Sequence, residues 1–149
     1  MSLVDLIRPE VVKIPLESGD KPGLIDELVK LLQDAGEIRD WRKAADAVHA
    51  REAMGSTGLE SGIAVPHAKT DAVSELTLSI GISPRGIEFD AADGKPSHIF
   101  FLLLAAPDKS GPDIQALAEI AKLSRSRAFL NSLVRAGSAD EVVELFRED

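Results

Sequence analysis

The sequence predicts an α/β domain in which a mixed β-sheet carries helices on both faces. The strongest indication is the apolar stretch IFFLLLAA at residues 99–106. It is typical of a buried strand and is much shorter than the ~20 residues that span a bilayer. Segments with apolar residues at helical spacing stand before and after it. Strands and helices alternate without a strict βαβ rhythm, so we expect parallel and antiparallel pairing in one sheet.

Length and composition are those of one compact domain. The chain has 149 residues, of which 44% are hydrophobic and 28% are charged. This balance is ordinary for a globular protein with a sizeable core. The sequence shows no linker, internal repeat or low-complexity tract. We therefore expect a single domain over residues 1–149.

The first part of the chain predicts a strand and two helices. Residues 10–16 (EVVKIPL) favour a strand. Pro22 and Gly23 favour the start of a helix, and Gly36 is a residue type that commonly ends one. A second helix is predicted from Asp40, a favourable N-cap. Its apolar stripe comprises Trp41, Ala44, Ala45 and Val48.

Three further strands are expected in the middle of the chain. The first is GIAV at 62–65, which leads directly into a Pro-His pair. The others are LTLSIGIS at 76–83 and the apolar stretch at 98–105. Glycines and prolines over residues 86–96 predict a turn-rich link between these two strands.

The remaining residues are predicted to be helical. Gly111 and Pro112 precede one helix, and residues 127–135 form another. The last helix is predicted to begin at Ser138, with Glu141 three residues later as in a capping box. The stripe of the first of these helices comprises Ile114, Leu117, Ala118 and Ala121.

The apolar stripe of the second helix is broken near its end by Arg51 and Glu52. Burial of a charged pair is costly unless both groups are satisfied. Either the helix ends at this point, or both side chains are held on the inner side by polar partners. This break draws attention to residues 51–57.

Charge and composition exclude several classes of protein. The net charge is −8 at pH 7, and no cluster of Lys and Arg is present to bind nucleic acid. The chain has no cysteine, which excludes disulfides, thiolate chemistry and Cys-based zinc sites. The N-terminus lacks the basic start and apolar run of a secretory signal. We expect a cytoplasmic protein without membrane insertion.

No cofactor and no metal centre are expected. Neither of the glycine-rich nucleotide loops G-x-G-x-x-G and G-x-x-x-x-G-K-[ST] is present, and no G-x-S-x-G elbow occurs. The histidines and carboxylates do not show a metal-ligand spacing such as H-x-x-x-H or H-E-x-x-H.

The chain has three histidines, so each can be weighed. His49 lies beside the apolar stripe of its helix and suggests a structural role. His98 starts the apolar strand and suggests an edge residue. His67 follows a short strand and a proline in a predicted turn, which places an imidazole on a rigid base where functional groups tend to lie.

The stretch REAMGSTGLESGIAVPHAK at residues 51–69 resembles the active-site segment of enzyme IIA proteins of the fructose, mannitol and nitrogen-regulatory group of the phosphotransferase system. Asp93-Gly94-Lys95-Pro96 before the apolar strand and DIQALAEIAKLS after it also fit that family. The resemblance covers most of the chain, from about Lys21 to the end.

This resemblance implies a phosphoryl carrier. The histidine phosphocarrier protein HPr, or an equivalent, would donate to His67, and the group would pass to an enzyme IIB or regulate target proteins. Arg51 would stabilise the transferring charge with its forked donors. Ser56 and Thr57 would add hydrogen bonds to the phosphoryl oxygens. For Arg51, a local ion pair with Glu52 or Asp46 is the structural alternative.

The chain departs from the family pattern at Asp113, where many members carry a second active-site histidine in a His-Leu pair. An ionised carboxylate cannot donate a hydrogen bond to a phosphoryl group. Either Asp113 points away, or phosphohistidine is less stable here, or His98 substitutes.

Two rival functions stay open at this point. The first is a regulatory module that keeps the enzyme IIA fold but is weakly phosphorylated or not phosphorylated at all. The second is a metal- or histidine-dependent hydrolase.

Overall fold

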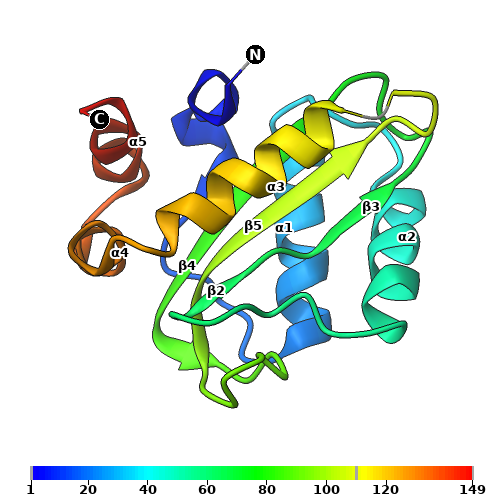
Figure 1. Cartoon of the computed structure of the whole chain (residues 1–149). Coiled ribbons are helices and arrows are strands. Elements are labelled where there is room, and N and C mark those ends of the chain that lie inside the picture. The colour runs from blue at the N-terminus through cyan, green and yellow to red at the C-terminus, as the bar shows by residue number, and fades with distance from the viewer. Residues whose placement is uncertain (1, 110, 149) are drawn as a thin grey trace.

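The computed structural model describes residues 2–109 and 111–148 (Figure 1). Two 3₁₀ turns, Leu3–Leu6 and Pro9–Val11, open the chain. The strands are β1 (Val12–Lys13), β2 (Ile63–Ala64), β3 (His67–Lys69), β4 (Thr77–Ile87) and β5 (Ser97–Ala105). The α-helices are α1 (Lys21–Asp34), α2 (Trp41–Ala53), α3 (Pro112–Leu123), α4 (Arg127–Arg135) and α5 (Ala139–Arg147).

The sheet is mixed, as predicted. The described residues form a five-stranded sheet in the order β1-β4-β5-β2, with β3 also paired to β5. β4 and β5 are antiparallel, whereas the other pairs are parallel. β2 and β3 pair with β5 in the same register, Ile63 with Ile99 and His67 with Leu103. The two short strands therefore form one edge, interrupted by Pro66, which lacks the N–H that a ladder needs.

Helices cover both faces of this sheet (Figure 1). Side chains of β5 alternate between two cores, as strand geometry requires. Phe100, Leu102 and Leu104 pack with α1 and α2. Residues of the opposite parity, Ile99 among them, pack with α3, α4 and α5. β5 is buried almost throughout, which confirms the buried strand predicted at 98–105.

The predicted starts and stops of the helices are largely confirmed. The Asp20 side chain caps α1 by accepting from the Gly23 N–H at 2.8 Å. Gly36 ends that helix with φ +80°, a conformation that glycine adopts without steric cost. Ser138 caps α5 by accepting from the Glu141 N–H at 3.2 Å. No helix in the described part of the chain is long and apolar enough to cross a membrane.

The strand predicted at 10–16 is much shorter in the structure. Only Val12–Lys13 pairs with β4, because the preceding Pro9–Val11 forms a 3₁₀ turn and Pro15 has no N–H to donate. The strand predicted at 76–83 is longer than expected and continues to Ile87. A register shift between Ile82 and Ile87 lets it pass through residues that had indicated a turn.

The apolar stripe predicted for α3 is wrong. Ala116 and Ile120 are the buried residues of this helix. Ile114, by contrast, is 65% exposed, and Ala118 and Ala121 of the predicted stripe are exposed too. The helix carries apolar residues on more than one side, so periodicity alone did not determine which side faces the sheet.

Candidate functional site

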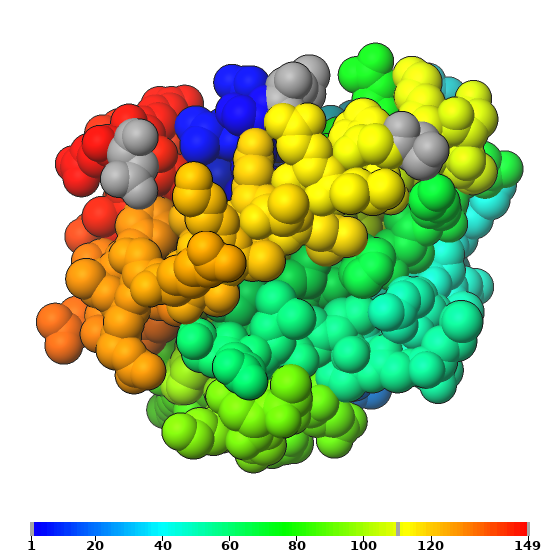
Figure 2. Space-filling model, in the orientation of Figure 1, coloured from blue at the N-terminus to red at the C-terminus, as the bar shows by residue number. Residues whose placement is uncertain are grey.

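A hollow of about 400 Å³ lies between α2, the edge strand β3 and α3. It brings together three of the residues that the sequence had indicated, Arg51, His67 and Asp113. Figure 2 views the face on which the yellow residues of α3 lie beside the teal and green residues of α2 and β3. The remaining walls are mainly apolar, with Ala47 and Leu103 among them.

His67 is the first residue of β3. The sequence analysis had placed it in a turn, and that prediction is wrong. Its backbone is held against Leu103 of β5 in parallel register. Leu103 also donates its N–H to the Pro66 carbonyl at 3.0 Å. The half-buried imidazole is therefore mounted on the fixed edge of the sheet.

A hydrogen bond to the backbone fixes the ring of His67. Its Nδ1 lies 2.7 Å from the carbonyl oxygen of Val65. A carbonyl oxygen can only accept, so in this contact Nδ1 carries the proton. In the neutral ring Nε2 is then left with its lone pair.

Arg51 lies in the last turns of α2 and contributes to the same hollow. Its Nη1 donates to the Gly55 carbonyl at 2.9 Å, which ties the guanidinium to the turn after the helix. Among the described residues it forms no ion pair with Glu52 or Asp46. The local ion pair considered as a structural alternative is thus not found.

Asp113 occupies the first turn of α3 and lines the wall that faces β3. Its Oδ1 accepts from the Gly111 N–H at 3.1 Å. The structure therefore places a carboxylate in the hollow that His67 lines, and does not turn it away from that hollow.

Lys69 also lines the hollow, and sequence reasoning missed it. A usable signal was present, because residues i and i+2 of a strand share a face and Lys69 stands two residues after His67. With Arg51 it places two basic side chains around the imidazole, opposite in sign to Asp113.

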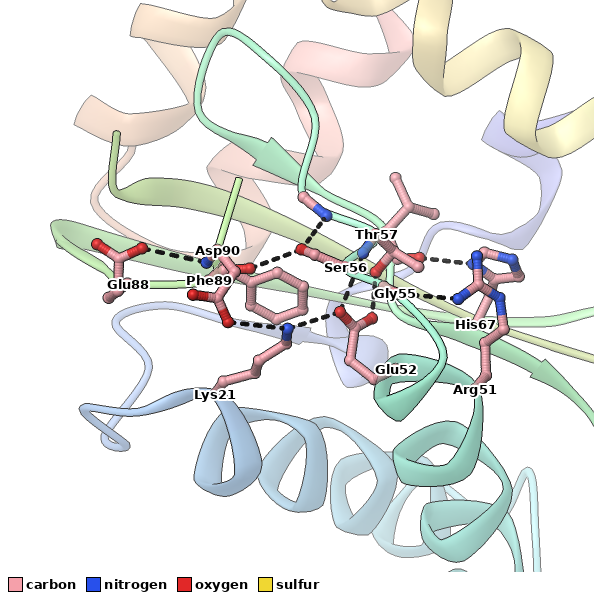
Figure 3. Close-up of polar contacts among 12 residues, drawn as sticks. Lys21, Arg51, Glu52, Gly55, Ser56, Thr57, His67, Glu88, Phe89 and Asp90 are labelled. Atoms are coloured by element: carbon pink, nitrogen blue, oxygen red, sulfur yellow. Dashed lines mark hydrogen bonds and ion pairs between the residues drawn. The ribbon is translucent and has the colours of Figure 1, made fainter. Parts of the chain in front are cut away.

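Ser56 and Thr57 are not among the lining residues of this hollow. The Ser56 hydroxyl donates to the Phe89 carbonyl at 2.8 Å. The Thr57 hydroxyl donates to the Glu52 carboxylate at 2.5 Å, and Thr57 is buried. Both hydroxyls are therefore engaged in holding the loop (Figure 3). Their contact with phosphoryl oxygens stays a prediction.

The other histidines lie elsewhere. His98 Nδ1 is 3.1 Å from the Ser83 carbonyl, and the residue lines a separate hollow near the start of β5. This contradicts the idea that His98 substitutes for a second active-site histidine. His49 Nε2 lies 2.8 Å from Asp26 Oδ1 of α1, and His49 does not line the hollow. Within residues 2–109 and 111–148, no group of three or more His, Asp or Glu could hold a metal ion.

Comparison with known proteins gives a family. The model of the family described as "Phosphoenolpyruvate-dependent sugar phosphotransferase system, EIIA 2" matches residues 5–149.

Relatives and solved structures agree with this match. The chain is 36% identical to a fructose-specific EIIA component of Haloferax volcanii, over 97% of this chain and 95% of the relative. It is 30% identical to a fructose-specific EIIABC component of Bacillus subtilis, of which it spans 23% while 99% of this chain is covered. The crystal structure of nitrogen regulatory protein IIA-Ntr from Neisseria meningitidis superimposes with a TM-score of 0.87 at 28% identity, covering 96% of this chain and 97% of that one.

Proposed function

The chain belongs to the EIIA 2 family of the phosphoenolpyruvate-dependent sugar phosphotransferase system, and on that premise we propose that it is a phosphoryl carrier whose acceptor atom is Nε2 of His67. The donor is a phosphohistidine of an HPr-like carrier protein. The Nε2 lone pair attacks phosphorus while the P–N bond of the donor breaks. The electron pair of that P–N bond stays on the donor imidazole.

One observation carries this proposal, the hydrogen bond from His67 Nδ1 to the Val65 carbonyl at 2.7 Å. It holds the neutral ring in the tautomer whose Nε2 is nucleophilic. It also limits rotation of the ring, so little orientation remains to be fixed when the donor arrives.

The charges around the ring suit a transferring anion. Phosphoryl transfer needs positioning and charge stabilisation more than covalent help. Arg51 and Lys69 line the hollow, and a guanidinium presents a fork that matches phosphoryl oxygens. Ser56 and Thr57 take a different part, since their hydroxyls hold the loop beside Arg51.

The rim of the hollow favours a protein partner. Met54, the C-cap of α2, lines the hollow and is 83% exposed. Ile114 of α3 follows the lining residue Asp113 and is 65% exposed. Exposed apolar side chains around a reactive group suit transient docking of another carrier. We propose an HPr-like protein as donor and an enzyme IIB or a regulatory target as the receiving partner.

Asp113 favours a second candidate function. A carboxylate in the hollow repels a dianionic phosphoryl group, which disfavours the phosphorylated form of the protein. In this second candidate the protein is weakly phosphorylated and its unmodified form binds a regulatory target.

Incubation with phosphoenolpyruvate, enzyme I and HPr separates the two candidates. For a carrier, we expect stoichiometric, acid-labile phosphorylation within the time in which HPr itself is phosphorylated and passes the group on. For a regulatory module, only a small fraction is modified at equilibrium. A complete lack of transfer, both from HPr and from its equivalent in the nitrogen-regulatory branch, would contradict the carrier proposal.

A further inference from the structure

A buried charged network lies next to the hollow, at the end of α2 and in the loop that follows it. Glu52 is the centre of it, and its side chain is only 5% exposed. One carboxylate oxygen accepts from the Thr57 N–H at 3.0 Å and lies 2.7 Å from Lys21 Nζ. The other accepts from the Thr57 hydroxyl at 2.5 Å (Figure 3).

Lys21 is itself held in place. It belongs to the first turn of α1, and its side chain is 19% exposed. Its ammonium lies 4.5 Å from the centre of the Phe89 ring and 3.6 Å from Asp90 Oδ2. The cation is therefore fixed between the carboxylate and the aromatic face.

The network continues through the backbone to His67. The Thr57 carbonyl accepts from the Val65 N–H at 3.1 Å. The carbonyl of the same Val65 accepts from the His67 ring. Thr57 is thus held on its N–H and hydroxyl by Glu52, and it holds Val65 in turn.

Stability alone is a weak reason for such an arrangement. A buried ion pair is often no more stabilising than apolar residues of the same volume. It does impose one geometry, because each oxygen of the carboxylate has a directed donor. The sequence position of Glu52, in the apolar stripe of α2, also offered a site where an apolar residue would have packed.

We propose that Glu52, held by Lys21, is a positioning residue for His67. It fixes Thr57, and through Thr57 the Val65 carbonyl that keeps the proton on Nδ1 and leaves Nε2 free. This inference rests on the proposed function of His67, but the ring geometry it concerns can be measured without any transfer.

The test compares Glu52→Gln, Thr57→Val and Thr57→Ser with the wild type, and Glu60→Gln is the control because Glu60 is exposed and outside the hollow. The first readout is the tautomer of His67, from ¹⁵N NMR shifts of the ring at about pH 8.5, well above the ordinary histidine pKa of about 6.5. The second is the rate of phosphorylation by phospho-HPr.

We expect Glu52→Gln and Thr57→Val to weaken the Nδ1–H tautomer and to slow transfer by roughly 10- to 100-fold, since small misplacements of a reacting group have effects of that size. Thr57→Ser keeps the hydroxyl and should restore both readouts, and Glu60→Gln should change neither. If Glu52→Gln does not fold, the Thr57→Val and Thr57→Ser pair decides alone.

Several results would overturn the inference. One is an unchanged tautomer in folded Thr57→Val, and another is slower transfer without a change of tautomer. A changed tautomer with a normal transfer rate would also overturn it. If the wild type accepts no phosphate, the proposed function fails, while the tautomer of the variants still decides whether Glu52 positions the ring.

Discussion

His67 and Val65 are joined by a hydrogen bond of 2.7 Å between Nδ1 of the ring and the carbonyl oxygen two residues earlier. Pro66 stands between them and restricts Val65 to extended geometry. The chain thus supplies the ring with an acceptor from its own backbone. The reactive tautomer is prepared before any partner binds.

The first prediction concerns the site of phosphorylation. His67→Gln should abolish acid-labile phosphorylation by phospho-HPr, because the nucleophilic nitrogen is removed. His98→Gln is the matched control, since His98 lines a different hollow. Intact-mass measurement should show one phosphoryl group on the wild type and on the control. A phosphoryl group on His67→Gln would refute the assignment.

The second prediction concerns Arg51. Arg51→Ala should accept phosphate about 10²-fold more slowly, because one charged contact to the transferring group is lost. Its hydrogen bond to Gly55 contributes about 1 kcal/mol to stability, so the variant should fold. Single-turnover transfer rates check this, and Arg125→Ala, an exposed arginine outside the hollow, should behave as the wild type. Equal rates for both variants would leave Arg51 a structural role only.

A good part of the fold could be predicted from periodicity and caps. The buried strand, the stop at Gly36 and the cap at Ser138 depend on local rules. The length of β4 does not depend on local rules, because pairing with β5 extends that strand past residues that favour turns. The inner side of α3 also depends on tertiary packing, since Ile114 and Ile120 are both suited to a core.

The candidate site, like the fold, could be predicted from the sequence only in part. His67 and Arg51 were indicated by a long motif, and the break in the α2 stripe pointed to Glu52. The direction of the Ser56 and Thr57 hydroxyls could not be predicted, because Glu52 and Phe89 that accept from them are placed by the fold. Nothing in the sequence marks Lys21 as the partner of Glu52, which lies 31 positions later but 2.7 Å away.

The third prediction concerns Gly58, which follows Thr57 in the loop. A Cβ at Gly58 would lie 2.8 Å from the Ala91 Cα, so backbone must move to admit it. Gly58→Ala should lower the free energy of unfolding by about 1–3 kcal/mol and should slow transfer, because the displaced loop carries Thr57. Urea unfolding measures the first effect.

Gly19→Ala is the control for this prediction. A Cβ at Gly19 meets nothing within 4 Å, so the substitution should change stability by less than about 1 kcal/mol. Similar stabilities for the two variants would show that the contact between the loop and Ala91 is loose.

The last prediction concerns Asp113, whose carboxylate lies in the hollow with His67. Two unit charges about 5 Å apart repel by about 3 kcal/mol at an effective dielectric of about 20, and solvent reduces this for a half-exposed side chain. Asp113→His replaces the repulsion with a group that can donate a hydrogen bond to the phosphoryl oxygens. It should raise the yield or the lifetime of phospho-His67, while the lost interaction with the α3 dipole costs only about 0.3–1 kcal/mol.

Two further variants separate the causes. Asp113→Asn removes the charge and keeps the size, so it should recover the electrostatic part of the gain. Asp140→His changes an exposed acid in the first turn of α5, away from the hollow, and should leave phosphorylation as it is. Formation and decay of phosphohistidine are measured for all variants with the same donor. Equal rates and lifetimes for Asp113→His and Asp140→His would mean that the carboxylate of Asp113 does not act on the phosphoryl group, and the reason for a weakly phosphorylated regulatory module would then disappear as well.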